Sequence, residues 1–233
     1  MRCCLTGLLL LVAATVLAAW FVPPIVAGAL VEGGLAAAGF SDTGTTVDVV
    51  ADPPPAILAG HADRVRIRSS DVVMGDLRAA RLDLTLVDVS LFGRTARTVD
   101  GTLQAVRIEP AQGAAFVVPE VIVRGPAAAA AATLRLTRAD LEPLVASAVQ
   151  SAGLIPTGLA LAAPDRLTVI LSGRTVTGTL GVESGALVAR LDGSLSAVLA
   201  RSAPGDPFQL RSVQVGPDGA VIAAVVDLAA LIR

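Results

Sequence analysis

Side chains that carry out covalent chemistry are scarce in this chain of 233 residues. It has no lysine, asparagine or tyrosine, a single histidine, His61, and two cysteines, Cys3 and Cys4. A P-loop and a Schiff base both need lysine, and one histidine with two N-terminal cysteines cannot build a structural zinc site. A Ser-His-Asp triad would depend on His61, and the Gly-x-Ser-x-Gly elbow is missing. We therefore predict a binding protein rather than an enzyme, with no catalytic residues, no metal and no cofactor.

Carboxylates are the one catalytic group in good supply, since the chain has 20 acidic residues. A pair of them could hydrolyse a glycoside. Against this, the single tryptophan is Trp20 in the apolar N-terminal stretch, and the rest of the chain has neither Trp nor Tyr to hold a sugar ring. A net charge of −2 and few, scattered phenylalanines also argue against a nucleic-acid partner.

Three arginines alternate along one segment and form the clearest polar candidate site. Arg64, Arg66 and Arg68 would share one face of a strand, with their guanidinium groups about 7 Å apart. Such a row could receive the anionic headgroup of a lipid. The alternative is a solvated outer face whose charge is balanced by Asp63 and Asp71.

Residues 3–22 form an uncharged apolar stretch which, as a helix of about 30 Å, is long enough to cross a bilayer. Arg2 on its short N-terminal side favours an exported body. Ala27-Gly28-Ala29 offers a small-residue cleavage site, so a cleaved signal peptide and an uncleaved anchor both stay open, and the length favours the anchor. We expect residues 1–23 to form this leader and residues 24–233 to form one domain on the extracytoplasmic face of the plasma membrane.

Most of the remaining chain alternates apolar and polar residues with a period of two, which indicates half-buried strands. Gly and Pro separate the runs, and Pro217-Asp218-Gly219 is typical of a hairpin turn. We expect strands at Thr45–Val50, in the run that begins at Asp63, around Leu82–Val87, and at Gly101–Glu109, Ala115–Arg124, Leu167–Leu171, Arg174–Val182, Leu187–Leu191, Phe208–Val215 and Ala220–Leu228.

One segment, Thr137–Ala152, has a helical period instead. Thr137 can cap this helix, Asp140 lies in its first turn, and Gly153 can end it. Pro143 falls inside it, where a proline costs a backbone hydrogen bond. The apolar residues at helical spacing are Leu141, Leu144, Val145 and Ala148.

Two shorter segments have weaker patterns. Pro24–Gly39 favours a second short helix, and the alanine tract Ala127–Ala132 is typical of a connector or a helical extension. The fold class is thus α+β, with a long antiparallel sheet and one or two helices on its apolar face. That face exceeds what one helix can cover. The pattern alone favours a closed sandwich over a groove open to a ligand.

A set of motifs in a fixed order changes this balance, because together they resemble the LmeA-like phospholipid-binding family of exported envelope proteins from high-GC Gram-positive-type bacteria. The family shows a Leu-Ala-Gly turn entering a strand, a step of the form "dV-x-x-G-x-L", a long alternating strand, a short helix and a last strand after a "pdG" turn. The matching segments are Ile57–Ile67, Asp71–Arg78, Leu82–Val89, Thr137–Ala152 and Val215–Val221. Ala51–Ala56 departs from the family, which often has a Gly-Phe-Pro-Phe-like element there.

The resemblance implies a tubular lipid-binding fold, in which a long curved sheet wraps a helix and leaves an apolar groove for phospholipid acyl chains. It implies a role in envelope lipid and lipoglycan homeostasis, with phospholipid and the membrane as partners and glycolipid-synthesis proteins as further candidates. An exported β-sandwich interaction module with a closed core is the alternative. Our candidates for the groove are Leu82, Leu84, Leu86, Leu141, Leu144 and Val145, each of which could equally be plain core.

Overall fold

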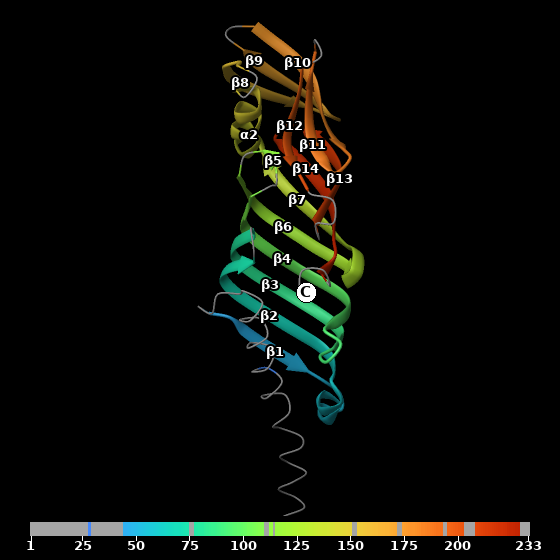
Figure 1. Cartoon of the computed structure of the whole chain (residues 1–233). Coiled ribbons are helices and arrows are strands. Elements are labelled where there is room, and N and C mark those ends of the chain that lie inside the picture. Colours follow the sequence, from blue (N-terminus) through green and yellow to red (C-terminus); the bar gives the residue numbers. More distant parts are fainter. Residues whose placement is uncertain are drawn as a thin grey trace, which may run out of the picture.

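The computed structural model describes residues 28, 44–74, 77–109, 112–113, 115–150, 153–171, 174–192, 195–202 and 208–228. These residues form two antiparallel sheets and the helix α2 (Arg138–Gln150) (Figure 1). The first sheet has eight strands, in the spatial order β1 (Thr46–Val50), β2 (His61–Met74), β3 (Leu77–Ser90), β4 (Thr95–Ile108), β6 (Phe116–Pro126), β7 (Ala130–Thr137), β14 (Gly219–Val226) and β13 (Phe208–Gly216).

A second sheet of six strands lies beyond the β7–β14 end of the first (Figure 1). Two short 3-10 helices, η1 (Pro54–Ala59) and η2 (Ala127–Ala129), connect strands of the first sheet. The order of the second sheet is β5 (Gln112–Gly113), β12 (Leu195–Arg201), β11 (Ala186–Leu191), β10 (Arg174–Glu183), β9 (Arg166–Leu171) and β8 (Pro156–Ala162).

The strands form where apolar and polar residues alternate, because the apolar side chains can then be buried while the polar ones stay exposed to solvent. In β4, for example, Val99 and Leu103 are buried while Asp100 and Gln104 are exposed. The predicted Pro217-Asp218-Gly219 turn is also present, since Gly216 pairs with Gly219 across a hairpin with a two-residue loop. Long strands with strict alternation fix the register, because a shift by one residue would expose the whole apolar set.

Helix α2 begins and ends as its sequence predicts. The Thr137 hydroxyl accepts a hydrogen bond from the Asp140 backbone N–H at 3.3 Å, and Asp140 Oδ2 accepts one from the Thr137 N–H at 2.8 Å. This reciprocal arrangement is a capping box. The Gly153 N–H donates to the Gln150 carbonyl at 2.9 Å after the last turn. Pro143 lies inside the helix, as expected.

The helix and strand β13 join the two sheets. α2 packs on β6, β7 and β14 of the first sheet and on β5, β8 and β12 of the second, while β13 packs on β8, β10 and β11. In the central strand β11, which packs on β13, Leu187, Val188 and Ala189 are all buried in sequence. A continuous buried run is what a strand covered on both faces requires.

The predicted long antiparallel sheet is confirmed, but its division into two sheets and the place of the helix differ from expectation. α2 lies at the junction of the sheets instead of running along the first one. The alanine tract was also partly mispredicted, because Ala130–Ala132 belong to strand β7, where they pair with β14 and β6. Alanine has little intrinsic preference for strands, and pairing on both edges overrides it here.

The leader and the second predicted helix fall outside the described residues, apart from Gly28. Gly28 is helical and buried, and a Cβ built on it would lie 3.6 Å from the Val47 carbonyl oxygen of β1. Among the described residues, no helix is long and apolar enough to cross a membrane. The division into residues 1–23 and 24–233 therefore stays a prediction, as does the open apolar groove.

Candidate functional site

The apolar side of the first sheet is the place where the sequence predicts a ligand. We call this side the inner face and define it by Val65 of β2, Leu82 of β3, Val99 of β4 and Val121 of β6, which are 1%, 3%, 2% and 6% exposed. Register pairs connect these strands, since Val65 lies opposite Leu86 and Leu86 opposite Val99. The inner face is therefore one continuous apolar surface across four strands.

The six predicted groove residues divide into two kinds by burial. Leu82, Leu141, Leu144 and Val145 are at most 3% exposed, so neighbouring side chains already cover them. Leu84 and Leu86 are only partly buried and pack against the edge of this core. Apolar surface that the protein leaves uncovered is what a hydrocarbon chain can cover at a gain in free energy. Leu84 and Leu86 are thus the members of the set best placed to contact an acyl chain.

The Leu84 side chain lies over a glycine of the neighbouring strand. Gly101 on β4 pairs directly with Leu84, and a Cβ built on Gly101 would approach the Leu84 Cδ1 atom to 2.6 Å and the Asp83 carbonyl oxygen to 2.8 Å. The Leu84 side chain therefore leans over the strand next to it. A larger residue at position 101 would displace it from this place.

The two predicted groups of residues are not brought together. Leu82, Leu84 and Leu86 lie on β3, which β4 separates from β6, whereas α2 packs on β6, β7 and β14. Leu144 instead borders a second feature, a hollow of about 290 Å³ between α2 and the start of β6. Its other lining residues are Ala115, Phe116, Val117, Ala139, Asp140 and Pro143.

The three predicted headgroup arginines lie on the opposite side of the sheet, which we call the outer face. Arg66 donates two hydrogen bonds to the Asp83 carboxylate, from Nε at 3.0 Å and from Nη2 at 2.7 Å. Arg68 Nε lies 3.9 Å from the same carboxylate, and Arg64 is exposed. The carboxylate that balances the charge of Arg66 and Arg68 is therefore Asp83, which lies opposite Arg68 in the β2–β3 pairing. Sequence reasoning missed it because cross-strand register is not visible in one sequence.

The Arg66–Asp83 pair lowers the pKa of Asp83, first through the hydrogen bond from Arg66, and raises the pKa of Arg66. A carboxyl whose folded-state pKa lies below its unfolded value of about 3.9 adds stability above that value, and this stability is lost as the pH falls through the folded-state pKa.

We expect Asp83→Asn to lower the free energy of unfolding at neutral pH by no more than about 1 kcal/mol, because the pair is partly exposed to solvent. The difference from the unsubstituted protein should shrink as the pH falls below about 4. Urea unfolding at neutral and acid pH measures both effects. Asp100→Asn is the matched control, since Asp100 meets Arg124 through a single contact of 3.4 Å. A difference that grows toward acid pH would contradict this account.

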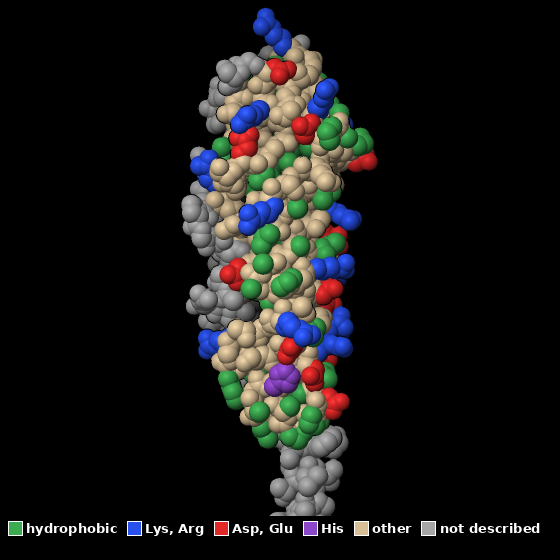
Figure 2. Space-filling model, turned by 90° about the vertical axis from the view of Figure 1, so that its right-hand side faces the viewer, with side chains coloured by type: hydrophobic (Ala, Val, Ile, Leu, Met, Phe, Trp, Pro, Cys, Tyr) green, Lys and Arg blue, Asp and Glu red, His purple; other side chains and the backbone are tan. Residues whose placement is uncertain are grey.

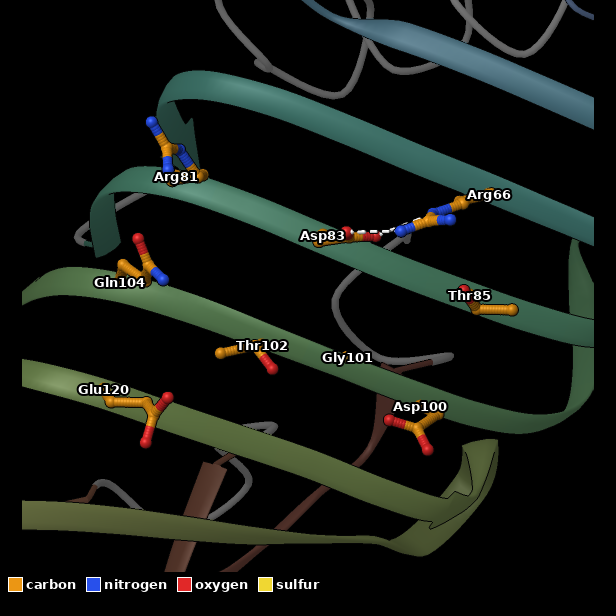
Figure 3. Close-up of a pocket in the computed structure, with 9 residues that line it drawn as sticks. All are labelled: Arg66, Arg81, Asp83, Thr85, Asp100, Gly101, Thr102, Gln104 and Glu120. Atoms are coloured by element: carbon orange, nitrogen blue, oxygen red, sulfur yellow. Dashed lines mark hydrogen bonds and ion pairs between the residues drawn. The ribbon is translucent and has the colours of Figure 1, made fainter.

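The outer face is hollowed around this pair (Figure 3). The hollow is about 550 Å³ in volume, and its side chains project from β2, β3, β4 and β6. Three carboxylates and two guanidinium groups line it, so its charge does not favour an anion. Among the described residues, no group of His, Cys, Asp and Glu could hold a metal ion. The lining residues are Arg66, Arg81, Asp83, Thr85, Asp100, Gly101, Thr102, Gln104 and Glu120.

The inner and outer faces are separated by the sheet itself. A lipid with its tails at Leu84 would have to reach around the sheet to contact Arg66. The headgroup role of Arg64, Arg66 and Arg68 therefore stays a prediction. His61 lies at the surface, with Nε2 3.6 Å from Asp63 and Nδ1 3.8 Å from Asp88.

Comparison with known proteins gives one match. A family model described as LmeA-like phospholipid-binding matches residues 13–232, nearly the whole chain. Neither the comparison with curated proteins nor the comparison with solved structures gave a match.

Proposed function

Since the chain belongs to the LmeA-like phospholipid-binding family, we propose that it holds phospholipid by its acyl chains on the inner face of the first sheet. One observation carries this location. Leu84 and Leu86 stay partly uncovered on a face whose neighbouring apolar side chains are buried. The hollow beside Phe116 and Leu144 offers a second apolar contact on the way to the helix.

The energetics suit reversible loading. A sixteen-carbon chain taken out of water gains on the order of 13 kcal/mol, at about 0.8 kcal/mol per methylene. A lipid in a bilayer already has this gain, so its transfer to an apolar protein surface is nearly neutral. A protein of this kind can take up and release lipid with ordinary Leu and Val side chains, and it needs no reactive group.

We further propose that the protein works outside the cytoplasm, on the outer surface of the plasma membrane, in envelope lipid or lipoglycan homeostasis. The sequence of residues 3–22, apolar and preceded by Arg2, supports export and anchoring. The scarcity of reactive side chains supports binding without catalysis. Proteins of envelope glycolipid synthesis are the further partners that this role would bring.

The direct test is to purify the full-length chain in mild detergent and to analyse its organic extract by mass spectrometry. We expect about one phospholipid molecule per protein chain, because the proposal gives each chain one lipid site. The variant with Arg64, Arg66 and Arg68 all changed to Gln then compares anionic with zwitterionic lipid, and unchanged selectivity would remove these residues from the site. Folded protein without lipid would overturn the proposal and favour a closed interaction module.

A further inference from the structure

Large apolar side chains are exposed at the β1 end of the first sheet. Phe92 in the turn between β3 and β4 is 76% exposed, Leu58 of η1 is 67% exposed, and Val50 at the end of β1 is 52% exposed. We call these three residues the tip. Phe92 and Leu58 are neighbours because the Leu91 N–H donates to the Gly60 carbonyl at 2.8 Å, which joins the β3–β4 turn to the end of η1. Val50 lies opposite Arg64, near the start of β2. Figure 2 shows hydrophobic side chains gathered at this lower end of the described chain.

The exposure of Phe92 is built into the backbone. Gly60 has a left-handed φ of 79°, and a Cβ on it would lie 2.3 Å from the ring of Phe92, so the ring rests directly on the glycine. The Gly93 N–H donates to the Ser90 hydroxyl at 3.2 Å and closes the turn. Local contacts therefore hold the ring at the surface.

The size and shape of the tip decide what can cover it. A specific protein interface buries about 1,200–2,000 Å² in total, with roughly 20–30 residues on each side. Three exposed side chains on separate segments bury far less area than such an interface requires. A bilayer, in contrast, accepts single apolar side chains from protruding turns at its headgroup boundary, while charged neighbours stay in water.

The charges around the tip agree with a lipid surface. Arg64 and Arg94 are exposed near it, and the Arg97 Nε lies 3.5 Å from Asp88. Acidic neighbours Asp52 and Asp63 are held together, since Asp63 accepts a hydrogen bond from the Asp52 backbone N–H at 2.5 Å. Near-balanced charge produces no repulsion from zwitterionic or anionic headgroups.

The position of the tip in the chain adds a second argument. The apolar residues 3–22 match the thickness of a bilayer core, and β1, which ends at Val50, is the first described strand after them. A bilayer that holds this stretch lies within reach of the tip.

We propose that the tip inserts into the surface of a phospholipid bilayer, with Phe92 and Leu58 reaching the boundary between headgroups and acyl chains. This contact orients the protein so that the β1 edge of the first sheet faces the membrane. It goes beyond the binding of lipid on the inner face, because it would orient the protein whether or not that face is loaded.

The sequence supplies a clean probe, because Trp20 is the single tryptophan. In full-length protein carrying Trp20→Phe, Phe92→Trp places the one indole at the tip. After reconstitution into phosphatidylcholine vesicles, we expect its emission to shift to the blue and to be quenched by lipids brominated on their acyl chains. The matched control is Ile155→Trp in the same background, since Ile155 is 67% exposed and precedes β8 in the second sheet. Quenching should be severalfold weaker there.

Leu58→Ser in the Phe92→Trp background should reduce the quenching, because one of the two inserted side chains is then polar. Absence of quenching at position 92, or equal quenching at positions 92 and 155, would overturn the proposal. So would a blue shift without quenching, which would show that protein and not lipid covers the tip. Lipid analysis of the same samples keeps this result separate from the inner-face site.

Discussion

Replacement of Leu141 by alanine is expected to lower the free energy of unfolding by about 2–5 kcal/mol, the range for a fully buried leucine. Leu141 is 0% exposed on the buried face of α2. The helix touches β6, β7 and β14 of one sheet and β5, β8 and β12 of the other. A cavity at Leu141 therefore weakens the packing of a helix that lies at the junction of the two sheets.

Urea unfolding followed by far-UV circular dichroism measures this effect. Glu142→Ala is the matched control, since Glu142 is the next residue of the same helix and is exposed. A surface substitution of this kind changes stability by no more than about 0.5 kcal/mol. Equal effects of the two substitutions would show that Leu141 is not buried in solution.

Much of the fold was predictable because its signals are local. The alternation in residues 101–109 specifies a strand within a few neighbours, and the Thr137 cap with Asp140 specifies the start of α2 within one turn. The hairpin at Pro217-Asp218-Gly219 likewise needs no distant partner. Each of these elements is present, although β4 begins at Thr95, six residues before the predicted start of the strand.

The sorting of strands into sheets was not predictable, because it depends on distant pairs. β14 pairs with β7, from which about 80 residues separate it in the chain, and a single sequence contains no sign of this partner. The same pairing turns Ala130–Ala132 into strand. Asp83 was missed as the partner of Arg66 for a related reason, since the register of β2 against β3 puts them together.

The sequence pointed to the inner-face candidates as a set of alternating leucines, but it could not rank them. Leu82, Leu84 and Leu86 have the same residue type and the same spacing. Leu82, which faces Leu103, is buried, whereas Leu84, which faces Gly101, and Leu86, which faces Val99, stay partly exposed. A glycine opposite one leucine and a large side chain opposite another can be recognised only once the register is known.

The second large effect is expected at this inner face. We predict that the double variant Leu84→Gln with Leu86→Gln retains about tenfold less phospholipid than the unsubstituted protein. Burial of a leucine side chain is worth about 1.5–3 kcal/mol, and these two are only partly buried without ligand. Loss of part of the contact with an acyl chain lowers the binding free energy by about 1.4 kcal/mol. This change corresponds to a factor of ten in affinity. Mass spectrometry of the organic extract, normalised to protein, measures the change.

Thr85→Gln is the control that separates the two faces of the same strand. Thr85 lies between the two leucines and lines the outer hollow, so its replacement adds the same amide without touching the inner face. We expect it to retain lipid at the level of the unsubstituted protein. Circular dichroism and the slope of the urea transition verify that both variants are folded. If the variant is unfolded, Leu84→Ala with Leu86→Ala removes the same apolar surface without adding a polar group. Equal lipid content in folded inner-face and outer-face variants would exclude Leu84 and Leu86 from the binding surface. An acyl chain in contact with these positions would bury two amides, which costs free energy and weakens binding.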